Sequence, residues 1–136
     1  QCIIRLGPAT TSIIKKIHTK EQLSITTSQK GTPTSCIDLS EFIIQLIQDK
    51  ITSFGLYHFS AFGETTWYGY ALEICKHFEE FDCKNIIPVK VYHSLAVRPK
   101  FSVLDNSKAR LLFKNYVLWN KRVETTIKDM LKGQTN

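Results

Sequence analysis

Polar side chains that could contact a ligand flank a turn made by Gly31 and Pro33. Gln29 precedes this turn and Thr34 follows it, so a short loop presents both an amide and a hydroxyl. The same residues also suit a well-formed turn that leads into a helix cap. The sequence therefore predicts either a ligand contact or a purely structural turn at this point.

Several patterns that would make the chain a self-sufficient enzyme are absent. There is no Gly-x-Gly-x-x-Gly or Gly-x-x-Gly-x-x-Gly loop for a dinucleotide, and no Gly-x-x-x-x-Gly-Lys-Ser/Thr loop for a nucleoside triphosphate. No tyrosine is followed four residues later by lysine, the helical spacing at which lysine lowers the pKa of a proton-donating tyrosine. Gly-x-Ser-x-Gly and His-Glu-x-x-His are also missing. We expect no catalytic residue in this chain.

The cysteines and histidines do not suggest a metal site or a disulfide framework. The four histidines are scattered, and no two cysteines have Cys-x-x-Cys spacing. Two of the cysteines fall within helical apolar patterns, where a free thiol packs as a small hydrophobic group. We therefore expect reduced, structural cysteines and no metal. These cysteines are Cys2, Cys36, Cys75 and Cys83.

Composition and charge restrict the class of protein. The 136 residues are 43% hydrophobic and 22% charged, as in a folded globular domain, and no apolar run approaches the roughly 20 residues of a membrane-spanning helix. The net charge is +6, but the lysines are spread out and the aromatic residues follow expected helix and strand interiors. We expect a soluble, cytoplasmic protein that binds neither membrane nor nucleic acid.

Apolar periodicity predicts alternating strands and helices. Strands are expected at residues 2–5, 23–27, 55–59 and 86–92. A helix capped by Thr65 or Thr66 is expected to run through Phe78, and a short helix is expected after Asp105. The alternation predicts an α/β fold with some parallel pairing. The apolar helix faces comprise Ile13, Ile14 and Ile17; Leu39, Phe42, Ile43, Leu46 and Ile47; Trp67, Ala71, Ile74, Cys75 and Phe78; and Trp119, Val123, Ile127 and Met130.

Two stretches resemble a known family. Residues 29–39, Gln-Lys-Gly-Thr-Pro-Thr-Ser-Cys-Ile-Asp-Leu, resemble the Gln-x-Gly-Ser/Thr-Pro-Thr…Asp-Leu segment of dTDP-4-dehydrorhamnose reductases. Residues 55–59 and 63–68, followed by Arg-Pro-Lys-Phe-Ser-Val-Leu-Asp-Asn-Ser-Lys at 98–108, occur in the same order as in that family. The resemblance covers nearly the whole chain and corresponds to the carboxyl-terminal half of an extended short-chain dehydrogenase/reductase.

The resemblance implies a division of labour. Residues 1–132 would be the sugar-nucleotide-binding part, a small mixed sheet with flanking helices, and 133–136 a tail. The Rossmann half, which carries NADPH or NADH and the Tyr-x-x-x-Lys pair, would precede this chain. Arg98 would bind the diphosphate through two parallel hydrogen bonds, and Gln29, Thr34 and Trp67 would contact the rest of the dTDP-sugar. Trp67 also falls on the apolar helix stripe, so a core position remains an alternative.

One departure from the family keeps a second function open. The family usually has Arg-x-x-Trp-x-Tyr-Gly after its first strand, whereas here the segment 5–8 leads almost directly into a helix, so the substrate tryptophan has no counterpart. A catalytically silent relative, similar to the regulatory subunit of methionine adenosyltransferase, is therefore the alternative to a reductase. Strands separated from a Rossmann sheet would also leave exposed edges, through which we expect self-association.

Overall fold

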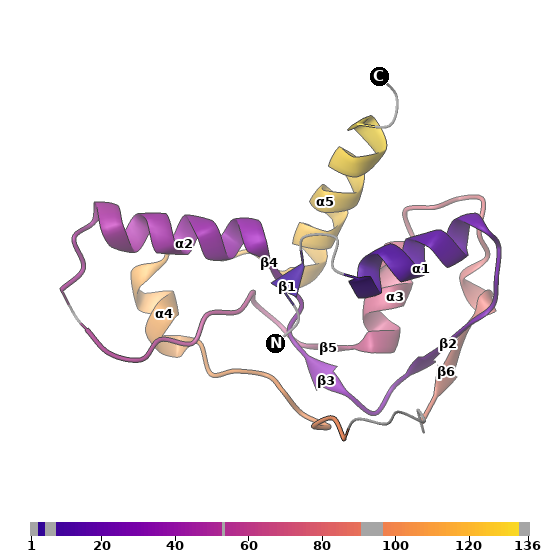
Figure 1. Ribbon diagram of the computed structural model, residues 1–136, viewed down its shortest axis with the longest axis horizontal. Helices are drawn as coiled ribbons and strands as arrows, with labels where there is room; N and C mark the ends of the chain where they lie inside the picture. Colours follow the sequence, from indigo (N-terminus) through magenta and orange to yellow (C-terminus); the bar gives the residue numbers. More distant parts are fainter. Residues whose placement is uncertain (1–2, 5–7, 53, 91–96, 134–136) are drawn as a thin grey trace.

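The computed structural model describes residues 3–4, 8–52, 54–90 and 97–133. It confirms the α/β class: five α-helices flank three small two-stranded sheets within these residues (Figure 1). Two sheets are parallel, β1 (Ile3–Ile4) with β4 (Thr34–Ser35) and β2 (Leu23–Thr26) with β6 (Ile86–Val89). The third, β3 (Lys30–Gly31) with β5 (Thr65–Thr66), is antiparallel. The expected strand 86–92 runs past the described residues, which stop at 90 and resume at 97.

The larger core lies where α1 (Pro8–His18), α3 (Trp67–Cys75) and α5 (Trp119–Gly133) meet the β2–β6 sheet. Most of the expected apolar faces of these helices are buried here, and Ile17, Ile74 and Ile127 have almost no exposed surface. Trp67, Trp119 and Met130 are only partly buried. The hydroxyl of Thr66 accepts a hydrogen bond from the amide of Gly69 at 3.0 Å and caps α3, as the sequence predicts. This packing fixes the orientation of α3.

A second, smaller core joins α2 (Cys36–Gln48) to α4 (Ser107–Leu112). Phe42 of α2 stacks on Phe59 with ring centroids 4.8 Å apart, and Phe113 packs edge-on against both rings. In Figure 1 this group lies at the opposite end of the molecule from α1 and α3, with α5 between them. The ion pair of Arg122 on α5 with Asp38 on α2 connects the two groups.

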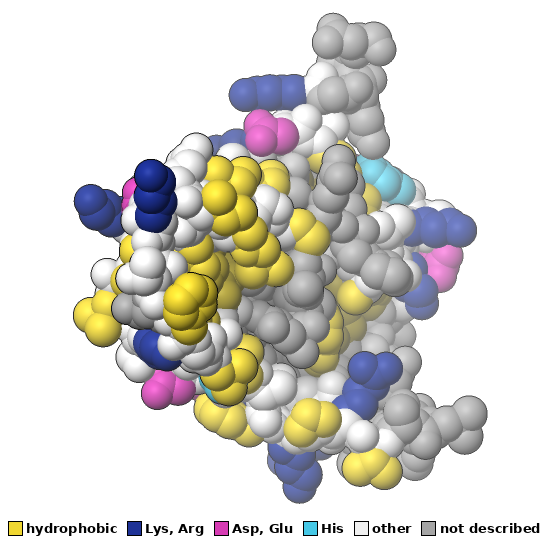
Figure 2. Space-filling view, turned by 60° about the vertical axis from the view of Figure 1, so that its left-hand side comes forward, with side chains coloured by type: hydrophobic (Ala, Val, Ile, Leu, Met, Phe, Trp, Pro, Cys, Tyr) yellow, Lys and Arg dark blue, Asp and Glu magenta, His cyan; other side chains and the backbone are white. Residues whose placement is uncertain are grey.

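The expected buried stripe of α2 is partly wrong. Phe42 is buried and Leu39 and Leu46 are half-buried, but the side chains of Ile43 and Ile47 are exposed, at 49% and 72%. Further hydrophobic residues are exposed on the same helix and on the loop that follows it, and Figure 2, which brings this side forward, shows hydrophobic side chains gathered on its surface. Nothing among the described residues covers this face. The exposed members are Ile37, Ile43, Ile44, Ile47, Phe54 and Leu56, which we call the α2 apolar face.

The strand expected at residues 55–59 is also absent from the described pairing. Among the described residues, this segment belongs to no strand ladder, and only Phe59 is buried, in the second core. His58, within this segment, is exposed. A strand needs a neighbouring strand to satisfy its backbone groups, and no described segment occupies that position.

The expectation of reduced cysteines is wrong for one pair. Cys75, at the end of α3, forms a disulfide with Cys83 in the short 3-10 helix η1 (Cys83–Asn85). The turn at Phe78 and Phe81 brings the two α-carbons within 5.9 Å, a distance that spacing in the sequence did not indicate. Cys36 is unbonded, and Cys2 lies outside the described residues.

Candidate functional site

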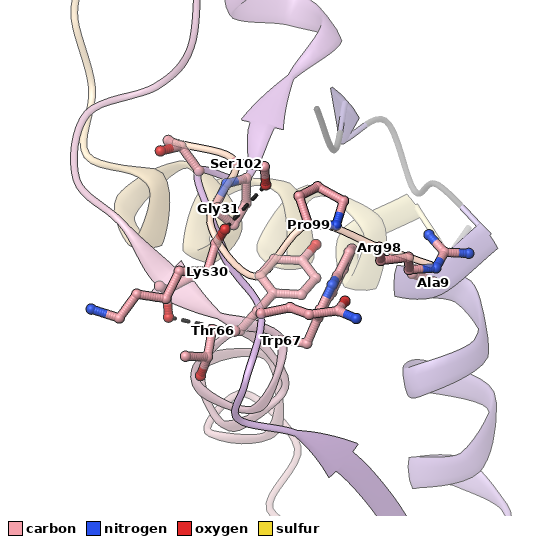
Figure 3. A pocket seen from close by; sticks show the side chains of 13 residues that line it. Ala9, Lys30, Gly31, Thr66, Trp67, Arg98, Pro99 and Ser102 are labelled. Atoms are coloured by element: carbon pink, nitrogen blue, oxygen red, sulfur yellow. Dashed lines mark hydrogen bonds between the residues drawn. The ribbon is translucent and has the colours of Figure 1, made fainter. Parts of the chain in front are cut away.

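A pocket of about 410 Å³ lies where β3 and β5 meet the start of α3 (Figure 3). It combines the turn at Gly31, the aromatic start of α3 and the segment around Arg98. Both stretches that resemble the reductase family contribute to it. Its lining residues are Ala9, Gln29, Lys30, Gly31, Thr32, Pro33, Thr65, Thr66, Trp67, Tyr70, Arg98, Pro99 and Ser102.

The turn is fixed by hydrogen bonds on both sides. Lys30 pairs with Thr66 across the β3–β5 ladder. The hydroxyl of the buried Thr32 donates to the carbonyl of Gly63 at 2.9 Å. Gly63 has a φ of +88°, a conformation that favours glycine, so the loop before β5 can take this position without strain. The pocket wall formed by the turn is therefore held in place by the β3–β5 ladder and by the Thr32 hydroxyl.

The aromatic wall comes from the first turn of α3. Tyr70 is almost completely buried, and its hydroxyl lies 2.8 Å from the hydroxyl of Thr10 on α1. The ring of Trp67 packs edge-on against Tyr70 with centroids 6.1 Å apart, yet Trp67 is only half-buried. The pocket thus offers Trp67 as an aromatic surface on which a sugar or base can pack.

The cationic groups lie at opposite ends of the pocket. Figure 3 shows Arg98 beside Ala9, at the start of α1, and Lys30 on the other side. The ammonium of Lys30 is paired with the Glu64 carboxylate at 2.9 Å. Within the described part of the chain, no carboxylate lies within ion-pair distance of Arg98, which is exposed. Its guanidinium is therefore available to an anionic ligand.

Three of the four predicted site residues meet in this pocket: Gln29, Trp67 and Arg98. Thr34 does not, and its prediction as a ligand contact is corrected. It has no exposed surface, and its hydroxyl donates to the carbonyl of Thr32 and accepts from the amide of Ala61. Both bonds stabilise the turn, which is the structural alternative that the sequence left open.

Tyr70 and Ser102 line the pocket but were not among the predicted site residues. Tyr70 lies one helical turn after Trp67, so its position on α3 was a usable signal. Ser102 gave no such signal, because its contact with the turn depends on how two distant segments meet. The segment 5–7, where the family tryptophan has no counterpart, lies outside the described residues.

The described residues show neither a metal site nor a membrane-spanning helix. No group of three or more His, Cys, Asp or Glu side chains is placed to hold a metal ion. No helix in this part of the chain is long and apolar enough to cross a membrane.

Comparison with known proteins agrees with the resemblance. The family model described as the RmlD substrate binding domain matches residues 8–132. The spore coat polysaccharide biosynthesis protein SpsK of Bacillus subtilis is 30% identical over 95 residues, which cover 70% of this chain and 32% of that protein.

Two solved structures are similar along most of the chain. The dTDP-4-dehydrorhamnose reductase of Clostridium acetobutylicum has a TM-score of 0.77 at 28% identity, covering 90% of this chain and 43% of that one. The dTDP-4-dehydrorhamnose reductase of Bacillus anthracis, solved in complex with NADP, has a TM-score of 0.74 at 26% identity, covering 88% and 42%. The chain spans less than half the length of each of these relatives. By the match over residues 8–132, it belongs to the RmlD substrate-binding-domain family.

Proposed function

We propose that the chain is the substrate-binding part of a dTDP-4-dehydrorhamnose reductase, which reduces dTDP-4-dehydro-L-rhamnose to dTDP-L-rhamnose for cell-surface polysaccharide synthesis in the cytoplasm. The observation that carries this proposal is the convergence of Gln29, Trp67 and Arg98 on one pocket. A cation, an aromatic surface and an amide are the groups that the diphosphate, the base or sugar, and the sugar hydroxyls of such a ligand require.

In this proposal the chain binds and orients the substrate. Arg98 holds the diphosphate through two parallel N–H···O bonds, and Trp67 packs against a ring of the ligand. The nicotinamide cofactor supplies the hydride when it is bound by the other half of the protein. The pocket contributes no proton donor of the Tyr-x-x-x-Lys type, so this chain alone is expected to be inactive.

Replacing Arg98 with alanine is expected to weaken dTDP-rhamnose binding by about tenfold or more, because hydrogen bonds to a charged partner contribute about 1.5–3 kcal/mol. Isothermal titration calorimetry of this chain measures the effect, with NADPH as a ligand that should not bind. Arg110→Ala is the matched control, because Arg110 is an exposed arginine on α4, outside the pocket lining. Equal affinity of the Arg98 variant and wild type would contradict the proposed role.

The reductase and the regulatory alternative make different predictions for a longer polypeptide that includes the nucleotide-binding half. If the protein is a reductase, this polypeptide should oxidise NADPH when dTDP-4-dehydro-L-rhamnose is added. Substrate binding without NADPH oxidation would favour the silent relative.

The α2 apolar face supports the proposal that an NAD(P)-binding half completes the protein. It consists of exposed isoleucines on α2 and of Phe54 and Leu56 on the loop that follows, and large apolar patches on a protein surface usually mark an interface. In the isolated chain, the same face is expected to promote self-association, which sedimentation at increasing concentration measures.

The substitution Ile44→Gln tests this interface. Ile44 is 52% exposed, so in the isolated chain the change should alter the unfolding free energy by no more than about 0.5 kcal/mol. In a polypeptide with the nucleotide-binding half, it should cost about 1–2 kcal/mol, because the side chain then becomes buried. Glu41→Gln, exposed on the same helix, should be neutral in both. Equal effects of Ile44→Gln in the two proteins would show that this face stays exposed.

A further inference from the structure

The two stretches that build the pocket meet at one backbone carbonyl. The carbonyl of Lys30 accepts from the amide of Ser102 at 2.9 Å and from the Ser102 hydroxyl at 3.1 Å. Figure 3 marks the contact of Ser102 with this turn by a dashed line. The amide of Lys30 donates to the carbonyl of Lys100 at 2.8 Å. Residues 100 and 102 are thus attached to the residue that directly follows Gln29.

This attachment lies only a few bonds from Arg98. Pro99 separates Arg98 from Lys100, and its ring restricts both its own φ and the conformation of the residue before it. Residues 97–101 are all exposed, so side-chain packing does little to hold them. Where Arg98 lies over the pocket therefore depends on the hydrogen bonds at Lys30.

Gly31 permits this close approach. A β-carbon at residue 31 would lie 3.0 Å from the Ser102 hydroxyl oxygen, closer than such contacts normally are. The φ of Gly31 is not in the left-handed region. The absence of a side chain at residue 31 therefore leaves room for the Ser102 hydroxyl where it now lies.

We propose that Ser102 is a positioning residue: its hydroxyl fastens the segment 98–102 to the turn and so sets where Arg98 meets the anionic part of the ligand. The inference rests on the proposed function of the pocket. It adds a residue that acts through Arg98 and that links the Arg98 segment to the Gly31 turn.

The binding test compares wild type, Ser102→Ala, Arg98→Ala and the double variant in calorimetric titrations with dTDP-rhamnose. Loss of the Ser102 hydroxyl should weaken binding about two- to tenfold, while the thermal unfolding midpoint falls no further than in a variant that loses a comparable neutral hydrogen bond elsewhere. In the Arg98→Ala background, Ser102→Ala should have less than about a twofold effect, since it acts through Arg98. Ser102→Thr keeps the hydroxyl and should retain affinity. Ser40→Ala, which removes another serine-to-carbonyl bond at 2.8 Å, is the control.

A second measurement requires no ligand. Trypsin cleaves after Lys100 only when the hydrogen bonds at Lys30 open, so Ser102→Ala should accelerate this cleavage severalfold relative to wild type. Gly31→Ala should do the same, because its methyl group displaces the Ser102 hydroxyl, and it should add nothing when Ser102 is already alanine.

The outcomes separate the two proposals. If wild type binds neither dTDP-rhamnose nor inorganic pyrophosphate, the proposed function fails. The rate of cleavage after Lys100 alone then decides whether the Ser102 hydroxyl holds the segment 98–102 to the turn. If wild type binds and the losses from Ser102→Ala and Arg98→Ala are additive, the positioning role is overturned. An unchanged cleavage rate after Lys100 overturns it as well.

Discussion

Replacing Arg122 with alanine is expected to lower the free energy of unfolding by about 3–5 kcal/mol, because it leaves a buried carboxylate without its partner. The carboxylate is that of Asp38, whose side chain is only 3% exposed in the first turn of α2. The Arg122 side chain, 21% exposed, reaches it from α5. This pair is the polar connection between the two hydrophobic cores, so both should be loosened by its loss.

The pH dependence follows from the pKa of Asp38. Burial raises this pKa above its usual value, and the hydrogen bond and charge of Arg122 oppose that rise. A raised pKa means that the folded protein holds a proton more tightly than the unfolded chain does. The contribution of Asp38 to stability therefore falls as the pH rises from its usual pKa, 3.8, through the raised value, and is constant above it.

In the Arg122→Ala variant the opposing effects are lost, so the pKa of Asp38 should rise further. The deficit relative to wild type should consequently shrink as the pH falls and Asp38 becomes neutral. Urea unfolding at several pH values measures this trend. A deficit that stayed constant down to acidic pH would show that lost packing of the Arg122 side chain, not an unpaired charge, is the cause.

Lys121→Ala provides the control on the same helix. Lys121 is exposed and pairs with Glu124 at 3.2 Å, and Glu124 keeps a second partner in Lys128 at 2.8 Å. These lysines lower the pKa of Glu124 to about 2. Exposed pairs contribute little to stability, so this variant should unfold nearly as wild type does.

The spacing of apolar residues predicted the helices that pack against other segments of this chain. The helices that contain Ile17, Ile74 and Ile127 were predicted because their apolar spacing matches the face that they bury. The same reasoning predicted α2 correctly as a helix, but it placed Ile43 and Ile47 in a buried stripe, and both are exposed. It also predicted a strand at residues 55–59, which is absent from the described pairing. Periodicity shows that a face is apolar, but it cannot show whether the surface that covers it is in the same chain.

The candidate site was predictable to a similar extent. The residues Gln29, Trp67 and Arg98 came from a resemblance that places family residues along the sequence, and the fold brings them to one pocket. Thr34 was misjudged because its neighbours on the turn are exposed to the pocket, whereas its own hydroxyl is used twice within the backbone. Ser102 became visible only when Lys30 and Lys100 were seen to be hydrogen-bonded.

The Cys75–Cys83 disulfide is expected to contribute about 2–3 kcal/mol to stability, because it restricts a short loop in the unfolded chain. Cys83→Ser should lose that amount in urea unfolding, and wild type in a dithiol reductant should approach the value of the variant. Cys36→Ser is the matched control, since Cys36 is unbonded. It should leave the effect of the reductant unchanged.

The disulfide also bears on the proposed cytoplasmic location. Cytoplasmic thiols are normally kept reduced, whereas this pair is oxidised and joins the end of the helix that carries Trp67 and Tyr70 to η1, directly before β6. Alkylation of thiols before cell lysis, followed by mass spectrometry, gives the redox state of the pair in the cell. A reduced pair would fit the cytoplasm. The free energy of unfolding there would then be about 2–3 kcal/mol lower than that of the oxidised protein. A fully oxidised pair would argue for an oxidising compartment and against the cytoplasmic part of the proposal.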